Sequence, residues 1–233
     1  MTFKNLLKMI WDIKNILPKI DIKGALLIPF DLKVKDNEFI HYRNLPVNWQ
    51  IKSVTSDDLP KEFSRNAVKI VDLFRRKTID LDYEVMLIFD YNTGELVYCF
   101  VNEDDGDEVS GQVDENIFHG KNIAIIHNHP KNYGSAPSCE NFQILSLNFQ
   151  DYEILSSWDG IWTIESKDSL PFNEIENIKH KIQEFYGYSW EIVENCGFCE
   201  EEMIVKSDEL FGRLLLRFIN NSHLNIKLTK KEL

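Results

Sequence analysis

The sequence lacks any apolar run close to the roughly 20 residues of a membrane span, so we expect no transmembrane helix. Charged residues also interrupt the first 17 residues, which therefore do not fit a secretory signal. Only four cysteines occur in 233 residues, too few for a disulfide framework. These absences together predict a reduced, cytoplasmic protein with no membrane partner.

An excess of basic residues is missing as well. Lys and Arg number 26 against 38 Asp and Glu, and the net charge of −12 argues against a nucleic-acid partner, because contact with the phosphate backbone needs clustered cations. The phosphate-binding loop, the dinucleotide fingerprint and the nucleophile elbow are also absent. What remains is 43 % hydrophobic and 27 % charged, as in ordinary globular proteins.

The hydrophobic pattern predicts an α+β fold, with a central mixed β-sheet flanked by helices. We expect helices over Met1–Leu17, from Asp57–Pro60 to Arg76, after Ser138, after Pro171 and around Leu210–Phe218. Strands are expected at Glu84–Asp90, Glu95–Val101, Asn122–Ile126, Tyr152–Ser156 and Ile161–Glu165. The acidic segment Glu103–Glu108 is typical of a solvated loop. We divide the chain into an N-terminal extension (1–56), a core domain (57–168) and a C-terminal helical extension packed on the core (169–233).

The chemistry concentrates where the strand Asn122–Ile126 ends. His127 and His129 are two residues apart, so both imidazoles leave the strand on the same side, and Pro130 ends the strand. Two histidines on one face are a ready pair of zinc ligands. A third ligand could come from the first turn of the helix capped by Ser138, where Asn141 lies three residues after the cap.

A general base would complete such a site. Glu84 lies at the start of a neighbouring strand and is the candidate, although Asp82 is close to it in sequence. Cys139 or Glu140 could turn inwards as an alternative ligand, but helix geometry points Cys139 elsewhere. Cys196 and Cys199 form a Cys-x-x-Cys step without the second pair that a zinc ribbon needs. Plain buried or semi-buried cysteines, a second metal site with distant ligands and a redox pair remain open.

Residues 84–165 resemble the JAMM family of metal-dependent isopeptidases (also called JAB or MPN-plus), including its RadC-like and phage-type branches. The family pattern is a Glu on an early strand, then His-x-His-Pro, then a Ser followed three residues later by Asp. This chain offers Glu84, then His127–Pro130, then Ser138 with Asn141. The resemblance implies a layering like that of cytidine deaminases and covers about a third of the chain.

The resemblance also implies roles. His127 and His129 would bind zinc, Glu84 would hold the attacking water and shuttle its proton, and Ser138 would hydrogen-bond the oxyanion. The reaction would be zinc-dependent hydrolysis of a peptide or isopeptide bond, with a protein or peptide substrate that could include a ubiquitin-like modifier. The chain departs from the pattern at Asn141, because a neutral amide oxygen is a poorer zinc ligand than a carboxylate.

This departure leaves three states open: an active enzyme with an unusual ligand, a weak metal site, and a pseudo-enzyme that keeps the fold for protein interaction. A further alternative is a RadC-like protein of mobile elements, whose biochemical role does not follow from the sequence.

Overall fold

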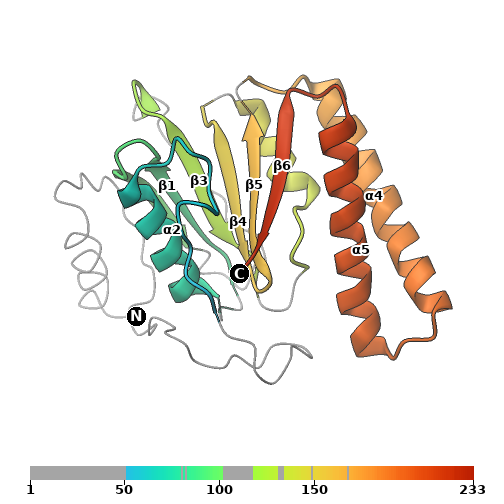
Figure 1. Cartoon of the computed structure of the whole chain (residues 1–233). Helices are drawn as coiled ribbons and strands as arrows, with labels where there is room; N and C mark the ends of the chain where they lie inside the picture. The colour runs from blue at the N-terminus through green and yellow to red at the C-terminus, as the bar shows by residue number, and fades with distance from the viewer. Residues whose placement is uncertain are drawn as a thin grey trace.

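A six-stranded sheet forms the centre of the computed structural model, which describes residues 51–79, 81, 83–101, 118–130, 134–147, 149–166 and 168–233 (Figure 1). The strands follow the spatial order β2-β1-β3-β4-β5-β6. Their bounds are β1 Val85–Asp90, β2 Leu96–Val101, β3 Ile123–Asn128, β4 Tyr152–Ser157, β5 Gly160–Ser166 and β6 Ile226–Glu232. Strands β3 and β4 are parallel, and every other neighbouring pair is antiparallel.

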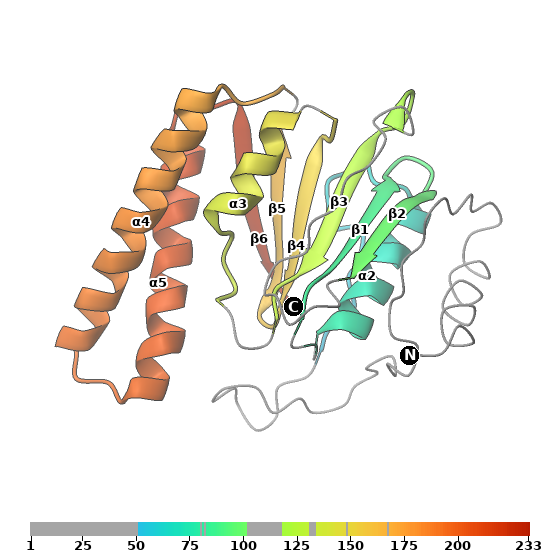
Figure 2. The same cartoon turned by 180° about the vertical axis from the view of Figure 1, so that it is seen from behind.

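Helices cover both faces of this sheet. Helix α2 lies on one face, whereas α3, α4 and α5 lie on the opposite side (Figures 1 and 2). Their bounds are α2 Arg65–Thr78, α3 Cys139–Gln143, α4 Phe172–Asn195 and α5 Glu200–Asn221, with a short 3-10 turn, η2, at Ile144–Leu147. The predicted α+β class, with a mixed sheet flanked by helices, is therefore confirmed.

Alternation along the strands divides the core between the two faces. In β3, Ala124 and Ile126 pack with the α2 residues, whereas Ile123 and Ile125 face the other way. His127 continues the second set, and it therefore emerges on the side of α3. The strand pattern thus places the histidine on the face that the C-terminal helices share.

Helix α2 begins later than the sequence suggested. Its N-cap is Ser64, whose hydroxyl accepts a hydrogen bond from the Ala67 amide at 3.1 Å. The acidic residues at 57–60 do not start the helix, because the Asp58 carboxylate instead accepts from the Thr55 amide and hydroxyl at 2.8 and 2.7 Å. Asp58 therefore stabilises a turn before the helix.

The C-terminal segment is not purely helical, because it also supplies strand β6, which the sequence pattern did not predict. Three Lys residues interrupt the apolar alternation of β6, and only one of its faces is well buried. Helices α4 and α5 pack on the sheet through apolar side chains that include Ile178, Leu215 and Trp162. Helix α4, which follows Pro171, thus shares an apolar cluster with residues of the sheet.

Three predictions concern segments outside the described residues: the helix Met1–Leu17, the apolar strand Gly24–Phe30 and the acidic loop Glu103–Glu108. Within the part that the structure describes, no helix combines the length and apolarity that crossing a bilayer requires.

A buried cation joins α2 to the β4–β5 turn and to the C-terminal residue, and its removal should destabilise the fold. Arg75 is fully buried and donates to main-chain oxygens of Leu233, at 2.9 Å, and of Ser157. We expect Arg75→Met to lower the free energy of unfolding by about 2–4 kcal/mol, because these charge-assisted bonds are lost and buried carbonyls lose their donor. Urea unfolding measures the effect, with the exposed Arg65→Met as the matched control. Equal losses in the two variants would contradict the assignment.

Candidate metal centre

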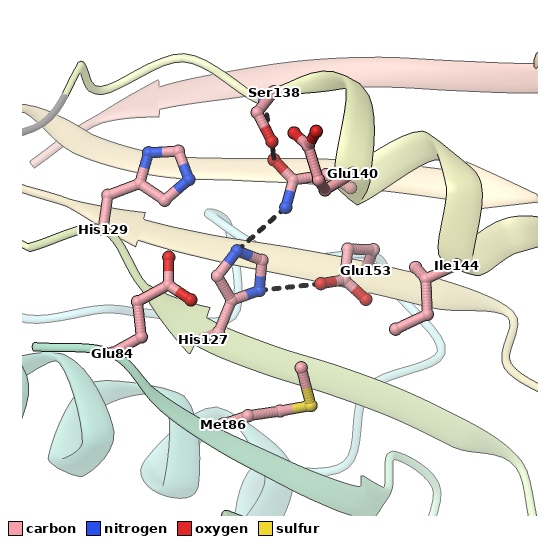
Figure 3. Close-up of a pocket in the computed structure, with 9 residues that line it drawn as sticks. Glu84, Met86, His127, His129, Ser138, Glu140, Ile144 and Glu153 are labelled. Atoms are coloured by element: carbon pink, nitrogen blue, oxygen red, sulfur yellow. Dashed lines mark hydrogen bonds and ion pairs between the residues drawn. The ribbon is translucent and has the colours of Figure 1, made fainter. Parts of the chain in front are cut away.

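A pocket of about 130 Å³ opens beside the carboxyl end of β3, on the face that carries α3 (Figure 3). Its lining contains all five residues predicted from sequence, together with four others. The lining residues are Glu84, Met86, His127, His129, Ser138, Glu140, Asn141, Ile144 and Glu153. The pocket therefore gathers side chains from β1, β3, β4, α3 and η2, and from residues that directly flank these elements.

His127 is the most buried of the candidate ligands, with 3 % of its surface exposed. Its Nδ1 lies 2.7 Å from Oε1 of Glu153, a buried carboxylate on the neighbouring parallel strand β4. The two atoms are close enough for an ion pair, but their geometry is not that of a regular hydrogen bond. On the other side of the ring, Nε2 lies 3.0 Å from the side-chain amide nitrogen of Asn141. The NH2 group of Asn141 can only donate, so Nε2 of His127 must accept. We therefore assign the ring proton to Nδ1.

His129 follows β3 directly and turns its ring toward that of His127, with ring centroids 5.6 Å apart. Its Nδ1 lies 2.7 Å from the carbonyl oxygen of Gly134. A carbonyl can only accept, so Nδ1 carries the proton and Nε2 keeps its lone pair. Both histidines thus have Nδ1 engaged by an oxygen, which is the arrangement that orients an imidazole for metal binding through Nε2.

Glu84 completes the cluster from the start of β1. One ligand atom from each of Glu84, His127 and His129 lies within 4.8 Å of the others. Asn128, between the two histidines, fixes the main chain on both sides of Glu84: its Oδ1 accepts from the Val85 amide at 2.7 Å and its Nδ2 donates to the Tyr83 carbonyl at 3.0 Å. The short motif His-Asn-His therefore has two effects. Its two histidines place their imidazoles on one face, and Asn128 between them positions the carboxylate of Glu84 through the neighbouring main chain.

Burial and nearby charges shift the pKa values of the two histidines in opposite directions. Burial alone would lower the pKa of His127, but contact with Glu153 and the charge of Glu84 raise it overall. Burial, together with the charge of neighbouring His127, lowers the pKa of His129. Burial raises the pKa of Glu153, against the opposing contacts of His127 and Gln150. His129 is therefore neutral at physiological pH, with a lone pair available to a cation.

Ser138 and Asn141 form a unit at the start of α3. Ser138 is the predicted N-cap, and its amide donates to Oδ1 of Asn141 at 2.7 Å, while its hydroxyl donates to the same oxygen at 3.3 Å. These two donors hold the Asn141 oxygen away from His127 and leave the NH2 group facing the ring. An amide nitrogen has no lone pair to offer a metal, so Asn141 would have to rotate and lose the Ser138 amide bond before its oxygen could serve as a ligand.

Of the other residues considered from sequence, Glu140 lies in the pocket lining and the cysteines do not. Glu140 lines the pocket at an exposed position, whereas Cys139 donates its thiol to Glu140 Oε1 at 2.8 Å and is not part of the lining. Cys196 and Cys199 lie between α4 and α5 as exposed free thiols, in a different part of the chain. Asp82, the alternative to Glu84, is outside the described residues.

Glu153 is the charged pocket residue that the sequence analysis did not single out. Its two oxygens contact His127 Nδ1 and the Gln150 side chain, the latter at 2.9 Å. The available signal was a single acid inside the apolar strand Tyr152–Leu155, where a carboxylate is costly to bury without a partner.

The donor set fits a divalent metal ion. Two imidazole nitrogens and a carboxylate converge from three chain positions, and an oxygen of Glu153 or Gly134 lies beside Nδ1 of each ring. Such a nitrogen and oxygen set is typical of catalytic zinc sites. The structure thus shows a cluster that could hold a metal ion at the predicted position.

Comparison with protein-family models found no match, and neither curated proteins nor solved structures gave one.

Proposed function

We propose that this chain is a zinc-dependent peptidase or isopeptidase of the JAMM type. One observation carries the proposal: the ligand atoms of Glu84, His127 and His129 lie within 4.8 Å of one another, in a pocket that Ser138 also lines. These side chains can serve hydrolysis of an amide by an activated water: two imidazole ligands, a base and a hydroxyl donor.

Each residue then has a defined task. His127 and His129 hold the metal through Nε2. When bound, zinc would polarise the amide carbonyl and lower the pKa of a coordinated water toward about 7. Glu84 takes the proton of the attacking water and delivers it to the leaving amine. Ser138 turns its hydroxyl from Asn141 to the developing oxyanion, and its present bond of 3.3 Å is long enough to exchange at small cost.

The substrate in this proposal is a protein or peptide, including a ubiquitin-like modifier attached through an isopeptide bond. The metal-and-base chemistry supports hydrolysis by an activated water, and the resemblance to JAMM proteins suggests both the amide linkage and the modifier. A cytoplasmic location belongs to the same proposal, since all four cysteines of the chain are free thiols.

A second candidate is a non-catalytic interaction module built on the same fold. The orientation of Asn141 favours it, because the NH2 group binds the lone pair of His127 that a metal would need. In this candidate the pocket is held together by its own hydrogen bonds, and its use is to bind a partner protein.

Metal removal tests the proposal. We expect the purified chain to cleave a quenched peptide library or a ubiquitin chain only with zinc, to lose cleavage after chelation and to regain it when zinc is added back. His129→Ala should abolish cleavage, because one of two nitrogen ligands is lost, whereas exposed His119→Ala should not. Chelator-resistant cleavage would contradict the proposal. Zinc binding without cleavage would favour the second candidate.

A further inference from the structure

The loop before α3 connects one candidate ligand to the C-terminal helices through a single peptide unit. His129 Nδ1 donates to the carbonyl oxygen of Gly134 at 2.7 Å. The amide at the other end of the same peptide, that of Ser135, donates to Oδ2 of Asp208 at 2.9 Å. Asp208 lies on α5, 73 residues further along the chain. The imidazole, the peptide and the carboxylate therefore form one hydrogen-bonded chain.

We infer that Asp208 is a positioning residue for the metal ligand His129, acting through the Gly134–Ser135 peptide. This inference rests on the proposed metal site. A carboxylate that accepts from a peptide amide polarises that peptide and strengthens its carbonyl as an acceptor. The stronger acceptor holds the Nδ1 proton of His129 and makes Nε2 a better electron-pair donor. His127 receives the same support directly from Glu153.

Further close contacts are made on both sides of this peptide. A Cβ atom at Gly134 would lie 2.6 Å from Oδ1 of Asp208, so only glycine leaves room for the carboxylate in its observed place. Ser135 is held a second time, because its hydroxyl donates to Asp159 at 3.0 Å, and Asp159 pairs with Lys230 of β6. Ser135 is also almost completely buried. Ser135 is thus linked to α5 and to β6, both outside the segment that resembles JAMM proteins.

The charge on Asp208 is subject to opposing influences. Burial raises its pKa, while the Ser135 contacts and the charge of Lys230 favour the carboxylate form and the charge of Asp159 opposes it. The Ser135 amide can donate to Asp208 whether Asp208 is charged or neutral, because a neutral carboxylic acid also accepts through its carbonyl oxygen.

Two variants separate this role from general folding. Asp208→Asn keeps the shape and removes the charge, and Gly134→Ala keeps both hydrogen-bonding groups but displaces the carboxylate. Glu209→Gln is the matched control, since it removes a charge from the next residue of α5, where Glu209 pairs with half-exposed Lys206 away from the pocket lining. Thermal unfolding identifies any variant that fails to fold, in which case the other one carries the test.

The experiment measures zinc affinity by competition with a chromophoric chelator, together with the side-chain ¹⁵N NMR signals of His129 in the metal-free protein. We expect each variant to weaken zinc binding by about 10-fold or more and to reduce the population of the Nδ1–H form of His129, while Glu209→Gln changes neither. Unchanged affinity and unchanged His129 signals would overturn the inference. If the native chain binds no zinc, the proposed function fails, and the NMR signals alone decide whether Asp208 positions His129.

Discussion

Replacing Glu84 by glutamine is expected to reduce zinc-dependent hydrolysis by about 10²–10⁴-fold, while zinc stays bound. The amide has nearly the same shape but cannot take a proton from the attacking water. Asn128 hydrogen-bonds only main-chain groups of Tyr83 and Val85, which the substitution leaves unchanged. The side chain of residue 84 should therefore keep its position. The loss should therefore appear in kcat rather than in folding.

The measurement is kcat/KM for peptide or isopeptide cleavage, with zinc content determined on the same samples. Glu95→Gln is the matched control, because Glu95 pairs with Lys121 away from the pocket lining. Hydrolysis that persists in Glu84→Gln at the native rate would rule out the assignment of Glu84 as the base.

Replacing Asn141 by aspartate is expected to tighten zinc binding by about 10–100-fold. One carboxylate oxygen can keep the hydrogen bond from the Ser138 amide, while the other takes the place of the NH2 group beside His127. The substitution thus supplies an anionic oxygen ligand and frees the His127 lone pair in one step. Zinc titration of the native chain and of Asn141→Asp measures the difference, with exposed Asn92→Asp as the control for added charge. Weaker or equal binding would show that position 141 does not face the metal.

The double variant Asn141→Asp with Glu84→Gln separates the two candidate functions. Cleavage that is absent from the native chain, appears in Asn141→Asp and disappears again in the double variant would favour a native pseudo-enzyme that keeps the fold for binding. Native cleavage that also depends on Glu84 would favour the active enzyme. No zinc binding in any form would remove the metal hypothesis and leave only the fold.

Local sequence signals predicted the part of the site that depends on short-range geometry. The two-residue spacing of His127 and His129 at a strand end placed both rings in one pocket, and Ser138 is the N-cap of the following helix as expected. Glu84 was harder, because it needs the register of β1 against β3, in which Met86 pairs with His127. The sequence pattern placed Glu84 beside the start of a strand but did not specify this register, and Asp82 remained an alternative.

The supporting acids could not be found in the same way. Glu153 reaches His127 because β3 and β4 are parallel neighbours, a pairing that local pattern does not specify. Asp208 reaches the His129 loop only once α5 has packed on the sheet, and one polar residue on an amphipathic helix carries no signal of such a contact. Strand β6 was missed for a related reason, since pairing with β5 rather than its own alternation determines its structure.

The most direct test of the metal site is the zinc stoichiometry of the purified chain after dialysis against buffered zinc, determined by elemental analysis. The double variant His127→Ala with His129→Ala serves as the comparison, and His119→Ala as the control for loss of a histidine outside the pocket lining. We expect one bound zinc per chain in the native protein and in the control, and none in the double variant. Equal zinc in the native protein and the double variant, or none in the native protein, would contradict the proposed site.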